Sequence, residues 1–184
     1  LNKLLRAAGV AGKRIGVIEN EAGPISIDHR LLRDAAMDPD GIFVLENGCI
    51  CCTTGGSGDE VERVLDRAVS MMNASGEGLD HLVVETSGLA DPGPLLELLF
   101  LPHRAGALHL DGVVTLVDAK HGVQHLVESG GWGGRAVEAS RQVAYADEVL
   151  VTKVDLSPDT VGPLHKAIET LNPTTQIRNV VLVD

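Results

Sequence analysis

The sequence predicts an α/β fold in which helices cover a mostly parallel β-sheet. Short apolar runs of strand length alternate along the chain with longer segments that have helical periodicity. Several of the apolar runs end in a charged residue followed by loop-forming residues. This alternation favours crossover connections, and therefore parallel strands between layers of helices.

Five segments are predicted to be buried strands because each is a short apolar run bounded by polar or turn-forming residues. They are residues 14–19, 80–85, 112–118, 148–153 and 177–183. Helices are predicted at residues 60–72, 135–146 and 158–171. The first helix has the clearest apolar face, formed by Val61, Val64, Leu65, Ala68 and Met72. Ligands of parallel sheets bind beyond the carboxyl ends of the strands, which is where Glu85, Asp118 and Lys153 are expected.

Length and composition limit the classes of protein to which the chain can belong. Its 184 residues, 44% of them hydrophobic, suit one domain with a packed core. The formal net charge of −11 and the aromatic content of 2% disfavour nucleic-acid binding, which needs a basic surface and stacking platforms. No apolar run reaches the roughly 20 residues of a membrane helix. We therefore expect no nucleic-acid or membrane partner.

All three cysteines of the chain, Cys49, Cys51 and Cys52, lie within four consecutive residues. Thiolates are soft ligands suited to zinc, copper(I) or iron–sulfur clusters, so this loop is a candidate metal site. Buried apolar cysteines or a redox pair are the alternatives, although the Cys-x-x-Cys spacing of redox pairs is absent. Three sulfurs need a fourth ligand to complete a tetrahedral site. Reduced cysteines without a targeting segment predict a cytoplasmic protein.

Motifs from several parts of the chain resemble one family when they are taken together. They are residues 17–23, Gly-Cys-Ile-Cys-Cys at 48–52, Glu-Thr-Ser-Gly-Leu-Ala-Asp-Pro at 85–92, Thr-Lys-Val-Asp at 152–155 and Leu-Asn-Pro-Thr at 171–174. This combination resembles the CobW-like P-loop GTPases, which handle metals and include zinc metallochaperones and proteins linked to cobalamin synthesis. The resemblance implies a three-layer P-loop NTPase-like domain over residues 1–184. It also implies GTP hydrolysis coupled to transfer of Zn²⁺ (or Co²⁺) to a client protein.

The resemblance also implies roles for individual residues. Glu85 would hold Mg²⁺ or position the attacking water, and the backbone N–H of Gly88 would meet the γ-phosphate of GTP. Lys153 would pack its stem along the guanine plane, while Asp155 would accept hydrogen bonds from the guanine donors. Thr152 begins this base-binding motif.

A second group of expected ligands lies upstream and would bind metal ions. Asp28 is expected to bind the magnesium–nucleotide complex, and Glu21 is expected to join Cys49, Cys51 and Cys52 around the transferred metal. Outside these motifs, His121 and His125 are four residues apart, so they form either a metal-binding pair on a helix or two exposed side chains.

The chain departs from the family pattern at two points. Thr152 stands where the family usually has Asn, and the hydroxyl of Thr cannot reproduce both the donor and the acceptor of an amide. Moreover, no Gly-x-x-x-x-Gly-Lys-Ser/Thr occurs, and residues 1–5 resemble the helix that follows the family's P-loop. We therefore expect a domain truncated at the P-loop and before a C-terminal domain, with GTP hydrolysis only in the intact parent protein. The alternative is a non-catalytic metal-binding or interaction domain.

Overall fold

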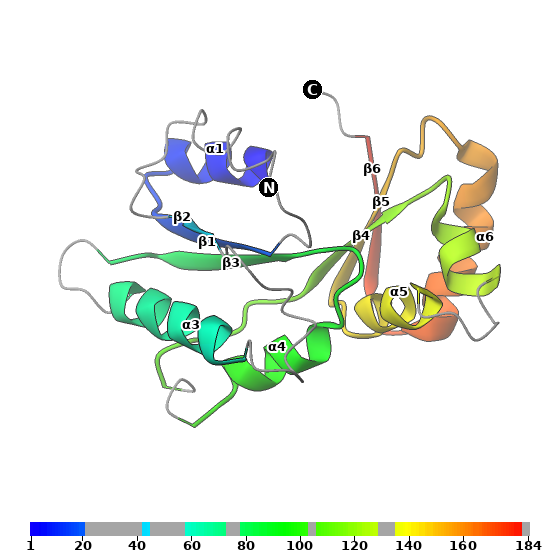
Figure 1. Ribbon diagram of the computed structural model, residues 1–184. Helices are drawn as coiled ribbons and strands as arrows, with labels where there is room; N and C mark the ends of the chain where they lie inside the picture. The colour runs from blue at the N-terminus through cyan, green and yellow to red at the C-terminus, as the bar shows by residue number, and fades with distance from the viewer. Residues whose placement is uncertain (21–41, 45–57, 73–77, 103–105, 129–134, 182–184) are drawn as a thin grey trace. The chain divides into compact units, whose positions relative to one another are not determined.

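The computed structural model describes residues 1–20, 42–44, 58–72, 78–102, 106–128 and 135–181. The chain forms two compact units (Figure 1), and each unit contains one three-stranded sheet. Unit 1 comprises Leu1–Ser87 with Pro94–His109, and unit 2 comprises Gly88–Gly93 with Leu110–Asp184. No helix within the described ranges combines the length and the apolarity needed to cross a bilayer.

Unit 1 is built on a parallel sheet with the strand order β2-β1-β3. Its elements are α1 (Asn2–Val10), β1 (Ile15–Asn20), β2 (Ile42–Val44), α3 (Gly58–Met72), β3 (His81–Thr86) and the part of α4 (Pro92–Leu99) from Pro94 onward. Figure 1 shows α1 on one side of this sheet and α3 and α4 on the other.

Alternation along β1 explains why helices cover both faces of the unit 1 sheet. Ile15 and Val17 point to one face, where they pack against Leu5 and Ala8 of α1. Ile18 points to the opposite face, where it packs against α3 and α4 through the buried residues Leu65, Ala68 and Leu95. A strand that is apolar on both faces therefore requires helices on both faces.

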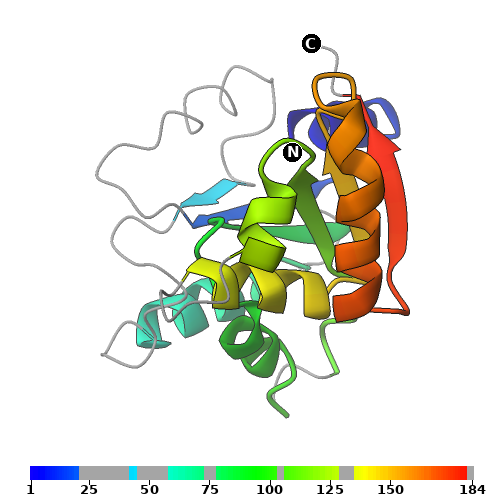
Figure 2. The same cartoon turned by 90° about the vertical axis from the view of Figure 1, so that its right-hand side faces the viewer.

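Unit 2 is built on a second parallel sheet with the strand order β4-β5-β6. Its elements are β4 (Val114–Asp118), the π-helix η3 (Gln124–Glu128), α5 (Arg135–Ala144), β5 (Glu148–Thr152), α6 (Pro158–Leu171) and β6 (Gln176–Val180). Both views show α5 and α6 on the same side of this sheet (Figure 2). On that side Val149 and Val151 of β5 pack against Val143, Leu164 and Ile168 of the helices, and all five are buried.

Asn172 joins three elements of unit 2 at the end of α6. Its side-chain amide donates hydrogen bonds to the carbonyl oxygens of Val143 at 3.0 Å and Ala146 at 2.9 Å, near the end of α5. Its side-chain oxygen Oδ1 accepts a hydrogen bond from the Thr174 N–H, 3.2 Å away, just before β6 begins. This buried amide therefore explains the Leu-Asn-Pro-Thr motif by structure rather than by ligand binding.

The predicted elements are confirmed to within a few residues at their ends, and the helix predicted at 158–171 has those bounds. Among the described residues the strands form two three-stranded parallel sheets, and no described strand pairs with both β3 and β4. The structure also has elements that were not among the predicted strands and helices, including β2, α4 and η3. β2 has only three residues, and α4 opens with Pro-Gly-Pro, a sequence that is typical of turns.

Candidate functional site

The Thr-Lys-Val-Asp motif leaves the carboxyl end of β5 in a tight turn. The Leu156 N–H donates to the carbonyl oxygen of Lys153 at 3.1 Å and closes this turn. Among the described residues other than glycine, Lys153 alone has a positive φ, at 57°. The left-handed conformation costs a non-glycine residue roughly 1–2 kcal/mol, so the surrounding structure must hold it in place.

Asp118, the last residue of β4, supplies a contact that holds this turn. Its Oδ2 lies 2.5 Å from Nζ of Lys153, so an ion pair joins the ends of the neighbouring strands β4 and β5. Its Oδ1 accepts the backbone N–H groups of Lys120 at 2.7 Å and His121 at 3.4 Å. Sequence analysis placed Asp118 at a strand end, but it did not predict the pairing with Lys153.

The pKa of Asp118 reflects opposing effects of its surroundings. Partial burial raises the pKa of this carboxyl, but the hydrogen bonds from Lys153 and Lys120 and the lysine charge outweigh burial and hold the pKa below its ordinary value. The side chain is 25% exposed, compared with 57% for that of Lys153. Asp118 is therefore the anchored, ionised partner of the pair.

Thr152 connects β5 to β4 through both its side chain and its backbone. Its hydroxyl donates to the carbonyl oxygen of Val117 at 3.4 Å, and its own carbonyl oxygen accepts the Ala119 N–H at 2.9 Å. Only 7% of the residue is exposed. At the position where the family usually has Asn, this chain therefore has a side chain whose hydroxyl bonds to the backbone of the neighbouring strand β4.

Asp155 lies in the same turn, two residues after Lys153, and differs from the buried Thr152 in its exposure. The residue is exposed, and its carboxylate accepts no hydrogen bond from any residue that the structure describes. A carboxylate in this state retains all its acceptor capacity for a ligand.

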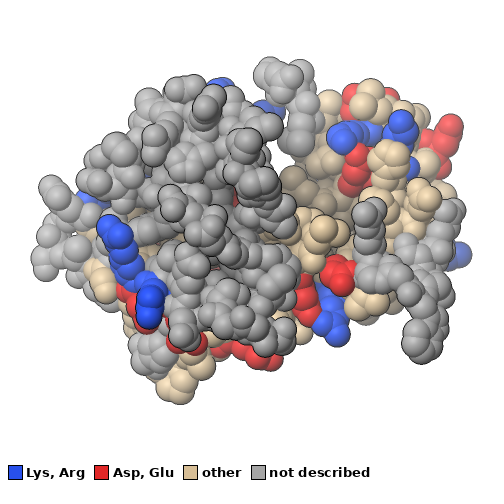
Figure 3. Space-filling view, in the orientation of Figure 1, with Lys and Arg blue, Asp and Glu red and all other residues tan. Residues whose placement is uncertain are grey.

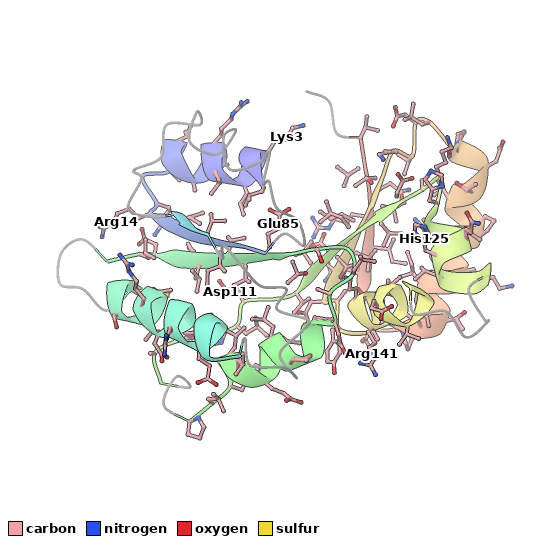
Figure 4. All side chains as sticks on the ribbon, viewed as in Figure 1. Lys3, Arg14, Glu85, Asp111, His125 and Arg141 are labelled. Atoms are coloured by element: carbon pink, nitrogen blue, oxygen red, sulfur yellow. The ribbon has the colours of Figure 1, made fainter. Side chains whose placement is uncertain are left out.

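The segment around Gly88 is attached to α5 within unit 2. Gln142 donates from Nε2 to the carbonyl oxygen of Ala90 at 2.8 Å, and Arg141 forms an ion pair with Asp91. Figure 4 labels Arg141 on α5. Sequence analysis missed both α5 residues because helical periodicity does not distinguish them from other polar residues on a helix surface.

Gly88 itself is exposed, and a Cβ placed on it would meet no atom within 4 Å. Its backbone φ angle is not positive either. Within the described residues, neither packing nor backbone conformation therefore requires glycine at this position.

Glu85 is the second-to-last residue of β3, so it lies close to the carboxyl end of the strand, as the sequence predicted. It is exposed and pairs in register with Glu19 of β1. Since Val83 packs on the α1 side of the sheet, alternation places Glu85 on that same face, as Figure 4 shows.

The predicted metal ligands Glu21, Asp28, Cys49, Cys51 and Cys52 lie outside the described residues. Within the described part of the chain, no group of three or more His, Cys, Asp or Glu residues is arranged to hold a metal ion. His121 and His125 do lie on one helical turn, closed by a 3.0 Å hydrogen bond from the His125 N–H to the His121 carbonyl oxygen. Their rings stack with centroids 6.2 Å apart.

Charged side chains of both signs are interspersed on the face that Figure 3 shows. The described Lys and Arg side chains visible there are spread over separate places, some beside Asp and Glu side chains, and do not gather in one basic patch. Two basic side chains of unit 2 are paired with acidic ones, since Arg178 Nε lies 2.6 Å from Glu148 Oε1 and Lys153 pairs with Asp118.

Parallel sheets flanked by helices, with charged residues at the carboxyl ends of strands, are typical of α/β domains that bind ligands such as nucleotides beyond those strand ends. Within this class the chain belongs to the CobW/HypB/UreG family, whose nucleotide-binding domain matches residues 1–179.

Named relatives support this assignment. The chain is 34% identical over 170 residues to a protein of Escherichia coli (strain K12) named zinc chaperone YjiA, covering 92% of this chain and 49% of that protein. It is 39% identical over 111 residues to a protein of Sinorhizobium sp named zinc chaperone CobW, covering 59% of this chain and 29% of that protein. The chain thus spans half or less of the length of these relatives.

A solved structure agrees with the sequence relationship. The crystal structure of the Zn(II)-bound YjiA GTPase from E. coli matches 99% of this chain and 52% of that chain, with a TM-score of 0.59 and 26% identity. The α/β fold with parallel sheets flanked by helices is therefore confirmed by a neighbour of the same family.

Proposed function

We propose that the chain is the nucleotide-binding part of a metal-handling GTPase that couples GTP binding and hydrolysis to the transfer of zinc, or of cobalt, to a client protein. The observation that carries the proposal is the exposed Asp155 carboxylate, which has no partner among the described residues and follows the anchored turn at Lys153. The family and the relatives named zinc chaperone support the same activity.

The chemistry of Asp155 suits guanine and disfavours adenine. Guanine presents two neighbouring donors, the N1–H and the exocyclic amine, and an ionised carboxylate accepts both. Adenine has an acceptor at N1, so the carboxylate would face a lone pair instead of a donor. The stem of Lys153 would cover the plane of either base, so discrimination rests on Asp155.

The phosphate end of GTP would involve Glu85, Gly88 and Asp28. The exposed carboxylate of Glu85 is a hard oxygen donor of the kind that Mg²⁺ prefers, so the residue fits this ion. When bound, Mg²⁺ neutralises phosphate charge during phosphoryl transfer. The open space at Gly88 supports close approach of a phosphate to its backbone N–H, and Asp28 is proposed as a further ligand of the magnesium–nucleotide complex.

The cargo metal would be held by Cys49, Cys51 and Cys52 with Glu21. Three thiolates and one carboxylate supply the four ligands of a tetrahedral zinc site, and thiolate ligands need the reducing conditions of the cytoplasm. Loss of the γ-phosphate would rearrange segments near Gly88 and change the affinity for the metal, which would release it to the client.

The test is a comparison of GTP and ATP affinity in the full-length protein that carries these residues. Asp155→Ala should lower the preference for GTP over ATP by roughly 10- to 100-fold, because it removes charged acceptors for two guanine donors. Asp159→Ala is the matched control, since it removes an exposed carboxylate four residues further along and should leave the preference unchanged. Equal affinity for GTP and ATP in the parent protein would refute the proposal and favour a non-catalytic metal-binding domain.

A further inference from the structure

A residue with a left-handed backbone and a short ion pair occur together at the carboxyl ends of β4 and β5. Lys153 has a left-handed backbone, and its ammonium lies 2.5 Å from Oδ2 of Asp118. The turn that begins at Lys153 leads directly to Asp155, the residue proposed to select guanine.

Asp118 is the fixed member of the pair because its surroundings hold it on several sides. Backbone N–H groups of Lys120 and His121 bond to its second oxygen, at 2.7 and 3.4 Å. The next residue, Ala119, is fully buried, and its carbonyl oxygen accepts a 2.6 Å hydrogen bond from the Thr160 hydroxyl. The backbone after Asp118 is therefore attached to α6, while the half-exposed lysine is the partner that can move.

Stability alone does not explain this arrangement. An ion pair with an exposed lysine contributes little to the free energy of folding, whereas a left-handed lysine opposes folding. Such a combination is typical of a backbone position held for function. Without Asp118, the lysine ammonium would also be free to pair with Asp155 in the same turn and occupy the carboxylate that must accept guanine.

We propose that Asp118 is a positioning residue for base recognition, which holds Lys153 away from Asp155 and fixes the turn that presents the Asp155 carboxylate. This inference rests on the proposed GTP specificity of the turn. It assigns to Asp118 a role that acts through Lys153, without contact between Asp118 and the nucleotide.

The experiment measures equilibrium affinity for a non-hydrolysable GTP analogue and the matching ATP analogue in the full-length protein. Asp118→Asn keeps an acceptor for the Lys120 N–H but removes the charge that holds Lys153. The preference for the guanine nucleotide should fall roughly 5- to 20-fold, between the small effect of an exposed ion pair and the larger effect of a misplaced binding group.

Glu148→Gln is the matched control, because it breaks the Arg178–Glu148 pair in the same sheet. The Glu148 side chain is 27% exposed, close to the 25% of Asp118, and its partner Arg178 is similarly exposed at 65%. A merely structural loss would lower the affinities for the GTP analogue and the ATP analogue alike. The ratio of these two affinities in Glu148→Gln should therefore match that of the parent protein.

Lys153→Met provides a second variant at an exposed position, where folding is not at risk. It removes the ammonium that ties the turn to Asp118, so the preference for guanine should fall, but by less than in Asp118→Asn, because no ammonium is left to pair with Asp155. Asp118→Asn should therefore add less than its own separate effect when it is combined with Lys153→Met. If either single variant keeps the parental ratio, or if the two effects add fully, the positioning role is wrong. A parent protein without preference for GTP would instead overturn the proposed function on which this role depends.

Discussion

At the scale of single residues, the charge of Asp118 is coupled to the folded structure. Burial raises the pKa of this carboxyl, but the hydrogen bonds from Lys153 and Lys120 and the charge of Lys153 together lower it by more, so the pKa in the folded protein lies below the ordinary value of 3.8. A lowered folded pKa means that the unfolded chain binds more protons as the pH falls through this range. The contribution of Asp118 to stability is therefore present above about pH 3.8 and is lost as the pH falls through the folded pKa.

This linkage predicts a pH-dependent effect of Asp118→Asn. Above about pH 5 the variant should be less stable than the parent protein by about 1 kcal/mol or less, and the difference should shrink below pH 3.8. Urea unfolding of both proteins between pH 3 and pH 7 measures this difference. A difference that stays constant over the whole range would contradict the linkage to the Asp118 charge.

At the scale of elements, the packing of α6 against the segment after β4 depends on one glycine. A Cβ on Gly122 would lie 2.6 Å from Cγ1 of Val117 and 2.9 Å from Cδ1 of Leu164. Leu164 is fully buried on α6, so it has no space into which to move. In contrast, a Cβ on Gly162, which lies on the exposed side of α6, would meet no atom within 4 Å.

The two glycines therefore predict substitutions of unequal cost. Gly122→Ala should destabilise the protein by about 1–3 kcal/mol through overpacking. Gly162→Ala should change the stability by less than about 1 kcal/mol, because the higher helix propensity of alanine is opposed by the crowding of its Cβ against Pro163, the next residue in α6. Denaturant unfolding of the parent protein and both variants gives the two changes. An equal loss from both substitutions would contradict the packing argument at Gly122.

At the scale of the whole molecule, the proposed function requires that nucleotide and zinc influence each other. Coupling between two sites is reciprocal, and typical couplings of about 1–3 kcal/mol change an affinity roughly 5- to 150-fold. The zinc affinity of the full-length protein should therefore differ by a factor in this range between the GDP state and the state with a non-hydrolysable GTP analogue.

Titration against a competing chelator measures the zinc affinity in each state. A triple variant with Cys49, Cys51 and Cys52 replaced by Ser should lose tight zinc binding while it keeps the GTP preference that depends on Asp155. Identical zinc affinity in both nucleotide states would leave a metal site and a nucleotide site without a chaperone cycle that joins them.

The sequence by itself determined the local structure and the family of this protein. Strands such as β5 are short apolar runs between polar residues, and the extent of α6 follows from its apolar spacing and from Pro158 at its start. The strand-end position of Glu85 also followed from the sequence. So did membership of the CobW/HypB/UreG family, whose nucleotide-binding domain matches residues 1–179. These features depend on neighbouring residues, and periodicity and motif spacing record them directly.

The tertiary structure alone decided which side chains became partners across the chain. Lys153 and Asp118 are 35 residues apart, and Arg141 and Asp91 are 50 residues apart, so only strand register and helix packing bring them together. The same holds for Thr152, whose hydroxyl bonds to β4 at the position where the family usually has Asn. Periodicity indicates which face of an element is buried, but the partner of a polar side chain depends on how separate elements pack.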